Sequence, residues 1–153
     1  MKKVIIYHSK HGSTKEYAGW LAEATGAELV PLAEAKKLDL GAYDAVAFGC
    51  PYFAGRLKIA GFVKDSLPRL AGKRIAFFAV GLAKPGSPDA SKGYEAALPE
   101  ETRAGMRFFY LPGRLVKAEL GFLERQMIKM AKAEDIDRMD RAAIAPLAEF
   151  LKG

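Results

Sequence analysis

A single stretch, KVIIYHSKHGST at residues 3–14, decides how this chain folds. Its first part, Lys3–Tyr7, is short, apolar and rich in β-branched residues, which is typical of a buried strand. After Gly12 the pattern changes to a helical period, because apolar residues such as Tyr17 and Leu21 recur one turn apart until Gly26 ends the segment. A strand that leads directly into a helix predicts a βα unit.

The same alternation of strand and helix continues along the chain. Four further strands are predicted at Ala27–Leu32, Ala45–Gly49, Lys73–Val80 and Met106–Leu111. Helices are predicted through Ala60, Phe62, Val63 and Leu67, around Tyr94–Leu98, at about Lys117–Lys132 and at Arg138–Lys152. This spacing indicates an α/β fold with a parallel sheet covered on both faces, and right-handed crossovers make it doubly wound. Without a repeat or a linker, residues 1–153 are predicted to form one domain.

Composition limits the functional classes. Half of the 153 residues are hydrophobic, which is enough for a core without disulfides. One cysteine, Cys50, with two histidines, His8 and His11, makes no recognisable zinc site. No apolar stretch approaches the roughly 20 residues of a membrane span, so we expect a cytoplasmic protein. The net charge of +6 allows an anionic membrane surface or an acidic partner. We expect no nucleic-acid binding, because no motif for it is present.

The loop Ser9–Thr14 carries the strongest functional signal. It joins a buried strand to a helix N-terminus, where unpaired backbone N–H groups with positive partial charge can bind a phosphate. Three hydroxyls, an amine and a glycine come together in it: Ser9, Ser13, Thr14, Lys10 and Gly12. The hydroxyls can donate to phosphate oxygens, and the glycine allows close approach of the backbone.

The loop also fits other patterns, which lead to different interpretations. Ser13 and Glu16 have the spacing of a capping box, which would only start the helix. The loop lacks the G-x-x-x-x-G-K-(S/T) spacing of nucleotide hydrolases and the dinucleotide G-x-G-x-x-G. The phosphate of a mononucleotide therefore remains as its ligand. His11 is interpreted as a spacer in this loop and not as an acid or base.

Two further loops are expected at the same edge of the sheet, where ligands of parallel sheets bind. Cys50–Arg56 contains adjacent aromatic residues that can stack on a planar ring, although ordinary packing on the next helix is the alternative. Gly81–Gly93 opens with backbone that can face the edge of such a ring, and it is followed by Tyr94. The candidate ring contacts are Pro51, Tyr52, Phe53, Ala54, Gly55, Gly81 and Leu82. Cys50 is interpreted as a small buried residue, and no catalytic side chain is assigned.

These three loops, in this order and spacing, resemble those of the flavodoxin-like superfamily. Ser9–Thr14 is similar to its phosphate signature, (S/T)-x-(S/T)-G-x-(S/T), with His11 in place of one hydroxyl residue. The resemblance implies a five-stranded sheet of order 2-1-3-4-5 in three layers. It also implies an FMN cofactor and electron transfer through the isoalloxazine ring.

Within this superfamily the chain is most similar to the flavodoxin-domain branch that includes the menaquinone-dependent protoporphyrinogen oxidases. The features that carry this similarity are Gly49–Gly55, Phe62–Lys64 and Phe122–Met130. Two loops, Pro112–Leu115 and Pro85–Pro88, depart from the sequence expected of these oxidases, which leaves the substrate open.

The segment Arg114–Lys132 separates on a helical wheel into an apolar and a basic stripe. Such a helix can dock to an anionic membrane, where a quinone would be found, or it can cover the sheet with its apolar stripe inward. The second interpretation is favoured, because the fold needs such a helix.

We therefore expect an FMN-binding oxidoreductase or electron-transfer protein. Its partner is expected to be a redox protein or a quinone, and peripheral contact with an anionic membrane is left open. The alternatives are a protoporphyrinogen oxidase-like, quinone-linked enzyme, and an FMN-free binding or regulatory module.

Overall fold

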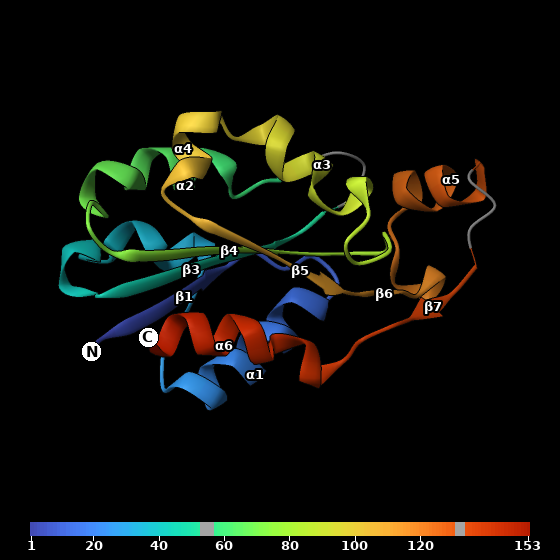
Figure 1. Cartoon of the computed structure of the whole chain (residues 1–153). Coiled ribbons are helices and arrows are strands. Elements are labelled where there is room, and N and C mark those ends of the chain that lie inside the picture. The colour runs from blue at the N-terminus through green and yellow to red at the C-terminus, as the bar shows by residue number, and fades with distance from the viewer. Residues whose placement is uncertain (53–56, 131–133) are drawn as a thin grey trace.

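A five-stranded parallel sheet forms the centre of the computed structural model, which describes residues 1–52, 57–130 and 134–153. Its strands lie in the order β2-β1-β3-β4-β5. They are β1 (Lys3–Tyr7), β2 (Glu28–Pro31), β3 (Ala45–Pro51), β4 (Arg74–Gly81) and β5 (Arg107–Pro112). Helices lie on both sides of this sheet (Figure 1), so the predicted doubly wound architecture and strand order are confirmed.

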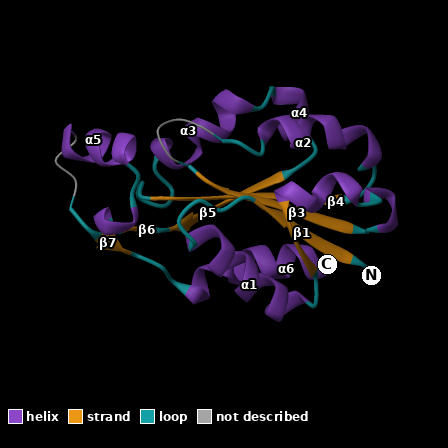
Figure 2. Cartoon of the chain, turned by 180° about the vertical axis from the view of Figure 1, so that it is seen from behind, coloured by secondary structure: helices purple, strands orange, loops and turns teal. Residues whose placement is uncertain are grey.

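Two layers of helices cover the sheet. One layer contains α1 (Ser13–Thr25) and α6 (Ala145–Lys152), and the opposite layer contains α2 (Ala60–Ser66), α3 (Pro88–Ala97) and α4 (Glu100–Ala104). Figure 2 shows the same arrangement from behind. Short 3₁₀ turns complete the connections: Leu32–Lys37, Leu40–Ala42, Leu67–Arg69, Lys117–Glu119 and Arg141–Ile144.

Alternating side chains of the strands build two cores, one on each face of the sheet. Val4 and Phe48 pack in the core beneath α2 and α3, whereas Ile5 and Phe78 pack in the core beneath α1 and α6. All four are fully buried, and burying each side chain stabilises the fold by about 1.5–3 kcal/mol. Burial on both faces explains why these strands are nearly continuous apolar runs.

The chain between β5 and α6 differs from the sequence prediction. The predicted helix Lys117–Lys132 is a 3₁₀ turn followed by α5, which covers only Phe122–Met130. Arg114 and Leu115 form strand β6 (Arg114–Leu115), which pairs antiparallel with β7 (Ile136–Asp137). The predicted helix Arg138–Lys152 is a 3₁₀ turn followed by α6, and α4 was not predicted. It is therefore α6, and not α5, that covers the sheet beside α1.

The unit of β6, α5 and β7 extends beyond the carboxyl edge of the sheet, clear of both helical layers (Figures 1 and 2). Two backbone hydrogen bonds hold the two ends of this unit to the sheet. The Gly113 amide donates to the Gly81 carbonyl at 2.8 Å, and the Arg138 amide donates to the Gly113 carbonyl at 3.0 Å. Residues of this unit line the same pocket as residues of the predicted loops Ser9–Thr14 and Gly81–Gly93.

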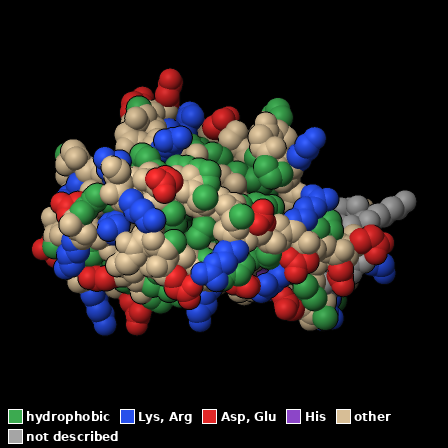
Figure 3. Space-filling view, turned by 60° about the horizontal axis from the view of Figure 1, so that its bottom comes forward, with side chains coloured by type: hydrophobic (Ala, Val, Ile, Leu, Met, Phe, Trp, Pro, Cys, Tyr) green, Lys and Arg blue, Asp and Glu red, His purple; other side chains and the backbone are tan. Residues whose placement is uncertain are grey.

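None of the helices in the described ranges is long and apolar enough to cross a membrane. Basic and acidic side chains are interspersed on the face that carries α1 and α6 (Figure 3). The net positive charge is therefore not concentrated on this face of the molecule.

Candidate functional site

A pocket of about 410 Å³ opens at the carboxyl edge of the sheet. The turn between β1 and α1 contributes Lys10, His11 and Ser13, and the ends of β3 and β4 and the residues after them contribute Pro51, Tyr52, Val80, Gly81, Leu82 and Ala83. Asp89 and Lys92 come from α3, and the segment after β5 closes the pocket with Gly113, Arg114, Leu115, Val116, Glu119, Leu120 and Glu124. Its volume is in the range of small-molecule and cofactor sites.

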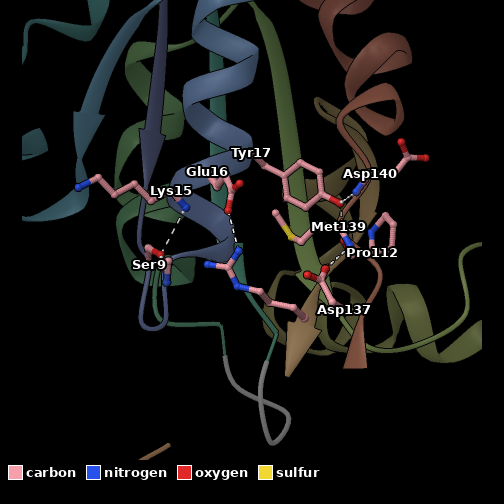
Figure 4. A network of polar contacts seen from close by, with 10 residues as sticks. Ser9, Lys15, Glu16, Tyr17, Pro112, Asp137, Met139 and Asp140 are labelled. Carbon is pink, nitrogen blue, oxygen red and sulfur yellow. Dashed lines mark hydrogen bonds and ion pairs between the residues drawn. The ribbon is translucent and has the colours of Figure 1, made fainter. Parts of the chain in front are cut away.

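Ser9 organises the turn between β1 and α1. Its Oγ accepts hydrogen bonds from the Gly12 amide at 3.1 Å and the Lys15 amide at 3.3 Å. Figure 4 shows Ser9 and Lys15 joined in this way at the start of the helix. Gly12 stands at the N-cap with φ of +93°, a conformation that favours glycine. The first-turn amides of Ser13 and Thr14 are not taken up by Ser9.

The capping box considered from the sequence does not form. Gly12 caps the helix without a side-chain hydrogen bond, and Ser13 is already its first residue. Glu16 instead pairs with Arg114, whose Nη1 lies 2.7 Å from the Glu16 Oε2. This leaves the Ser13 side chain at the pocket wall.

Thr14 carries a polar atom without a partner. Its side chain is fully buried, and Oγ1 makes no hydrogen bond to any described residue. A buried hydroxyl without a partner is costly, typically by about 1–3 kcal/mol. At a helix N-terminus this orphaned donor points to an anionic ligand that would satisfy it.

Three cationic or basic side chains surround the loop. Lys10 and His11 belong to it, and Arg114 reaches it from β6. A Cβ placed on Gly12 would lie 3.3 Å from the Arg114 Nη2, so the guanidinium lies directly against the turn. Together they make this end of the pocket a site for an anion.

Tyr17 fixes the segment that brings Arg114 to this place. Its hydroxyl donates to the Pro112 carbonyl and accepts from the Asp140 amide at 3.0 Å (Figure 4). Burial raises the pKa of Tyr17, so it stays a neutral donor at physiological pH. The helix that begins at the loop is thereby tied to the chain leaving β5.

Glu124 is an internal anion in this cationic end of the pocket. Its carboxylate lies 3.0 Å from the Lys10 Nζ and 2.8 Å from the His11 Nε2, and the residue is only 7% exposed. Burial alone would raise its pKa, but hydrogen bonds with His11, Lys10 and the Gly121 amide outweigh burial and hold the pKa below its usual value. Glu124 is therefore ionised and tethers α5 to the loop.

Another part of the pocket wall is an aromatic ring. Tyr52 is partly buried and lines the pocket, and it packs on α3 so closely that a Cβ on Gly93 would lie 2.0 Å from the ring. Tyr52 thus packs on α3 and not on the next helix along the chain, as the packing alternative had it, and its place in the pocket wall leaves stacking on a planar ring as a prediction. Gly81 and Leu82 line the same pocket.

The geometry joins an anion site at a helix N-terminus to a recess with an aromatic wall. The family model for the flavodoxin domain matches residues 4–141. The chain belongs to this flavodoxin domain family. No curated protein matches the sequence.

Solved structures with this fold include flavodoxins. The Trp repressor binding protein from Bacillus subtilis superposes with a TM-score of 0.60 at 16% identity, covering 99% of this chain and 97% of that one. Oxidised flavodoxin 2 from Bacillus cereus superposes with a TM-score of 0.54 at 19% identity, covering 96% of this chain and 99% of that one. A flavodoxin from the domain Archaea superposes with a TM-score of 0.53 at 19% identity, covering 86% of this chain and 97% of that one. At these identities the similarity establishes the fold.

The sequence-predicted site residues of this flavodoxin domain fall into three groups. The structure brings these to the pocket wall: Lys10, His11, Ser13, Pro51, Tyr52, Gly81 and Leu82. Ser9, Gly12 and Thr14 lie behind the wall and shape the turn. Phe53, Ala54 and Gly55 lie outside the described residues.

Two other residues named from the sequence are part of the core. Cys50 is fully buried, and burial raises the pKa of its thiol to about 12, in agreement with the structural interpretation. Tyr94 stacks on Phe108 with ring centroids 4.4 Å apart and does not line the pocket.

Sequence reasoning missed Arg114 and Glu124 as pocket residues. Arg114 was assigned to the basic stripe of a helix, but β6 carries it to the loop. Glu124 was not singled out, although it is the one carboxylate within the stretch Phe122–Met130. A lone acidic residue in a basic and apolar segment is a signal that could have found it.

Proposed function

We propose that this flavodoxin domain binds FMN in the pocket at the carboxyl edge and transfers electrons through it. The observation that carries the proposal is the buried Thr14 hydroxyl without a partner, directly behind Ser13 in the wall of a pocket that Tyr52 also lines. A phosphate beside Ser13 and a planar ring beside Tyr52 match the two halves of FMN. The family membership supports the same cofactor.

The residues of the chain have separate tasks in this proposal. Ser13 donates to the phosphate from the first turn of α1, the buried Thr14 hydroxyl reaches it through a small opening of this turn, and Lys10 and Arg114 balance its charge. Tyr52 orients the ring and, with Leu82, keeps water from one side of it. The flavin, when bound, supplies one- or two-electron chemistry. No acid, base or nucleophile of the chain is required, and the buried Cys50 thiol is too weak an acid to act as one.

The test is a flavin titration of the purified protein, with FMN and riboflavin compared side by side. We expect quenching of FMN fluorescence at one site per chain and much weaker binding of riboflavin, because riboflavin has no phosphate to satisfy the loop. Equal binding of the two flavins would contradict the assigned phosphate site. Absence of any flavin binding would favour an FMN-free binding or regulatory module.

We extend the proposal to the redox partner, which is a redox protein or a quinone. Mixing the chemically reduced holoprotein with a naphthoquinone under anaerobic conditions distinguishes the two, because a quinone partner is expected to reoxidise the flavin at a rate that saturates with quinone concentration and exceeds that of free reduced FMN. Adding protoporphyrinogen to the oxidised holoprotein tests the oxidase alternative in the same instrument.

A further inference from the structure

Helix α5 presents its apolar side chains to solvent. Among the described residues, four of the six large hydrophobic side chains that are exposed belong to this one helix. They are Phe122 (75% exposed), Leu123 (77%), Met127 (46%) and Met130 (84%). The sequence-based expectation that this stripe faces the sheet is therefore wrong.

The polar anchor of α5 lies to one side of these apolar residues. On a helical wheel Leu123, Met127 and Met130 fall within an arc of about 60°, while Glu124 lies roughly 100° beyond Leu123. Glu124 is buried against Lys10 and His11, as described above. The helix is thus held to the domain by a carboxylate and leaves its apolar side free.

The exposed charges of α5 are both basic. On the same wheel Arg125 and Lys129 lie on the side of the helix opposite the apolar arc, next to Phe122, and both are exposed. With Ala118 and Ile128 they line a surface recess of about 470 Å³. The single carboxylate of the helix is turned inward, so its outer surface combines apolar and positive groups, the combination that favours an anionic lipid surface.

A second copy of the chain is a weaker candidate for this surface. A nine-residue helix is about 13 Å long, so the area that one of its sides can bury is small. A stable protein–protein interface buries about 800 Å² on each partner. A bilayer needs no matching surface, and α5 lies clear of both helical layers, so a flat membrane can reach it (Figures 1 and 2).

We propose that α5 is an interfacial helix that docks this domain to an anionic lipid bilayer. Leu123, Met127 and Met130 enter the boundary between headgroups and acyl chains, and Arg125 and Lys129, on the opposite side of the helix, attract the anionic surface through their charge. This docking brings the pocket edge that contains Glu124 close to the membrane surface. It is independent of the proposed cofactor and can be tested without any flavin.

The test is co-sedimentation of the full chain with phosphatidylcholine vesicles that contain or lack phosphatidylglycerol. We expect binding to the anionic vesicles, and loss of about tenfold or more in affinity for Leu123→Gln/Met130→Gln. Arg125→Gln/Lys129→Gln is expected to abolish the preference for anionic lipid. Because all four side chains are exposed, these variants should keep the wild-type circular dichroism spectrum and melting temperature.

Matched controls use exposed residues elsewhere in the fold. Leu29→Gln on β2 removes an exposed apolar side chain, and Lys36→Gln/Lys37→Gln removes two exposed charges, and neither should change vesicle binding. Binding that depends on the charges but is unaffected by Leu123→Gln/Met130→Gln would overturn insertion. A wild-type dimer in sedimentation velocity that Leu123→Gln/Met130→Gln dissociates would assign the surface to a second copy instead.

Discussion

Glu124 and His11 are 113 residues apart in the sequence, yet the Oε2 of one lies 2.8 Å from the Nε2 of the other. The same carboxylate is 3.0 Å from the Lys10 Nζ. An anion supplied by the chain thus faces the cations that would meet a cofactor phosphate. Glu124 and a phosphate compete for the same partners, and four predictions about this pocket follow from that geometry and its neighbours.

Replacing the competing carboxylate should tighten phosphate binding. Glu124→Gln removes one negative charge near the loop, worth about 1 kcal/mol at 4 Å in water, so we expect the dissociation constant for FMN to fall about fivefold. Fluorescence titration measures it. Glu119→Gln is the control, because it makes the same charge change at an exposed position of the same pocket. Weaker FMN binding by Glu124→Gln would mean that the carboxylate orients Lys10 for the phosphate.

The tether between α5 and the loop should depend on pH. The folded-state pKa of Glu124 lies below its ordinary value of 4.5, so its stabilising contribution is present above pH 4.5 and is lost as pH falls through the folded pKa. In hydrogen exchange at neutral pH, we expect the amides of α5 to be better protected in the wild type than in Glu124→Gln. At pH well below 4.5 the two proteins should exchange alike. Equal protection at neutral pH would show that the carboxylate does not hold α5.

The sheet and the turn between β1 and α1 could be predicted because their signals are local. Strands β3 and β4 are buried on both faces, so each is a continuous apolar run whose type does not depend on distant residues. Ser9, Gly12 and Thr14 are residue types that favour a turn before a helix, Ser9 and Thr14 through their hydroxyls and Gly12 through its conformational freedom. The two predicted strands differ from the observed ones by one or two residues at their ends.

The segment after β5 could not be predicted in the same way. A helical period shows that Leu123, Met127 and Met130 share one face, but it does not say whether that face meets the protein. The orientation of α5 is set by Glu124, and its partners Lys10 and His11 come from the opposite end of the chain. A contact across such a distance leaves no local pattern.

Removing the orphaned hydroxyl should separate binding from stability. In Thr14→Val a buried hydroxyl without a partner is replaced by a methyl group. We therefore expect the free energy of unfolding of the apoprotein to stay unchanged or to rise by up to about 1–3 kcal/mol. FMN binding should weaken about tenfold, because a hydrogen bond to a charged phosphate is lost. Urea unfolding and flavin titration measure the two effects, and riboflavin binding should not change.

Thr25→Val is the matched control in the same helix. The Thr25 hydroxyl donates to the Leu21 carbonyl at 2.7 Å, so its removal should lower the free energy of unfolding by about 1 kcal/mol and leave FMN binding unchanged. If Thr14→Val destabilised the apoprotein as much as Thr25→Val does, the Thr14 hydroxyl would have a partner within the chain, and its assignment to the phosphate would fail.

The last prediction concerns the ring site of the pocket. In Gly93→Ala the new Cβ would lie 2.0 Å from the Tyr52 ring, so the ring must leave its place on α3. If Tyr52 walls the ring site, FMN and riboflavin should both bind about tenfold more weakly, whereas Thr14→Val affects FMN alone. Gly61→Ala on α2 is the control, because no atom lies within 4 Å of its Cβ, and it should stabilise the fold by about 0.5–1 kcal/mol without changing binding. Unchanged riboflavin affinity in Gly93→Ala would remove Tyr52 from the ring site, because displacement of its side chain is unavoidable in that variant.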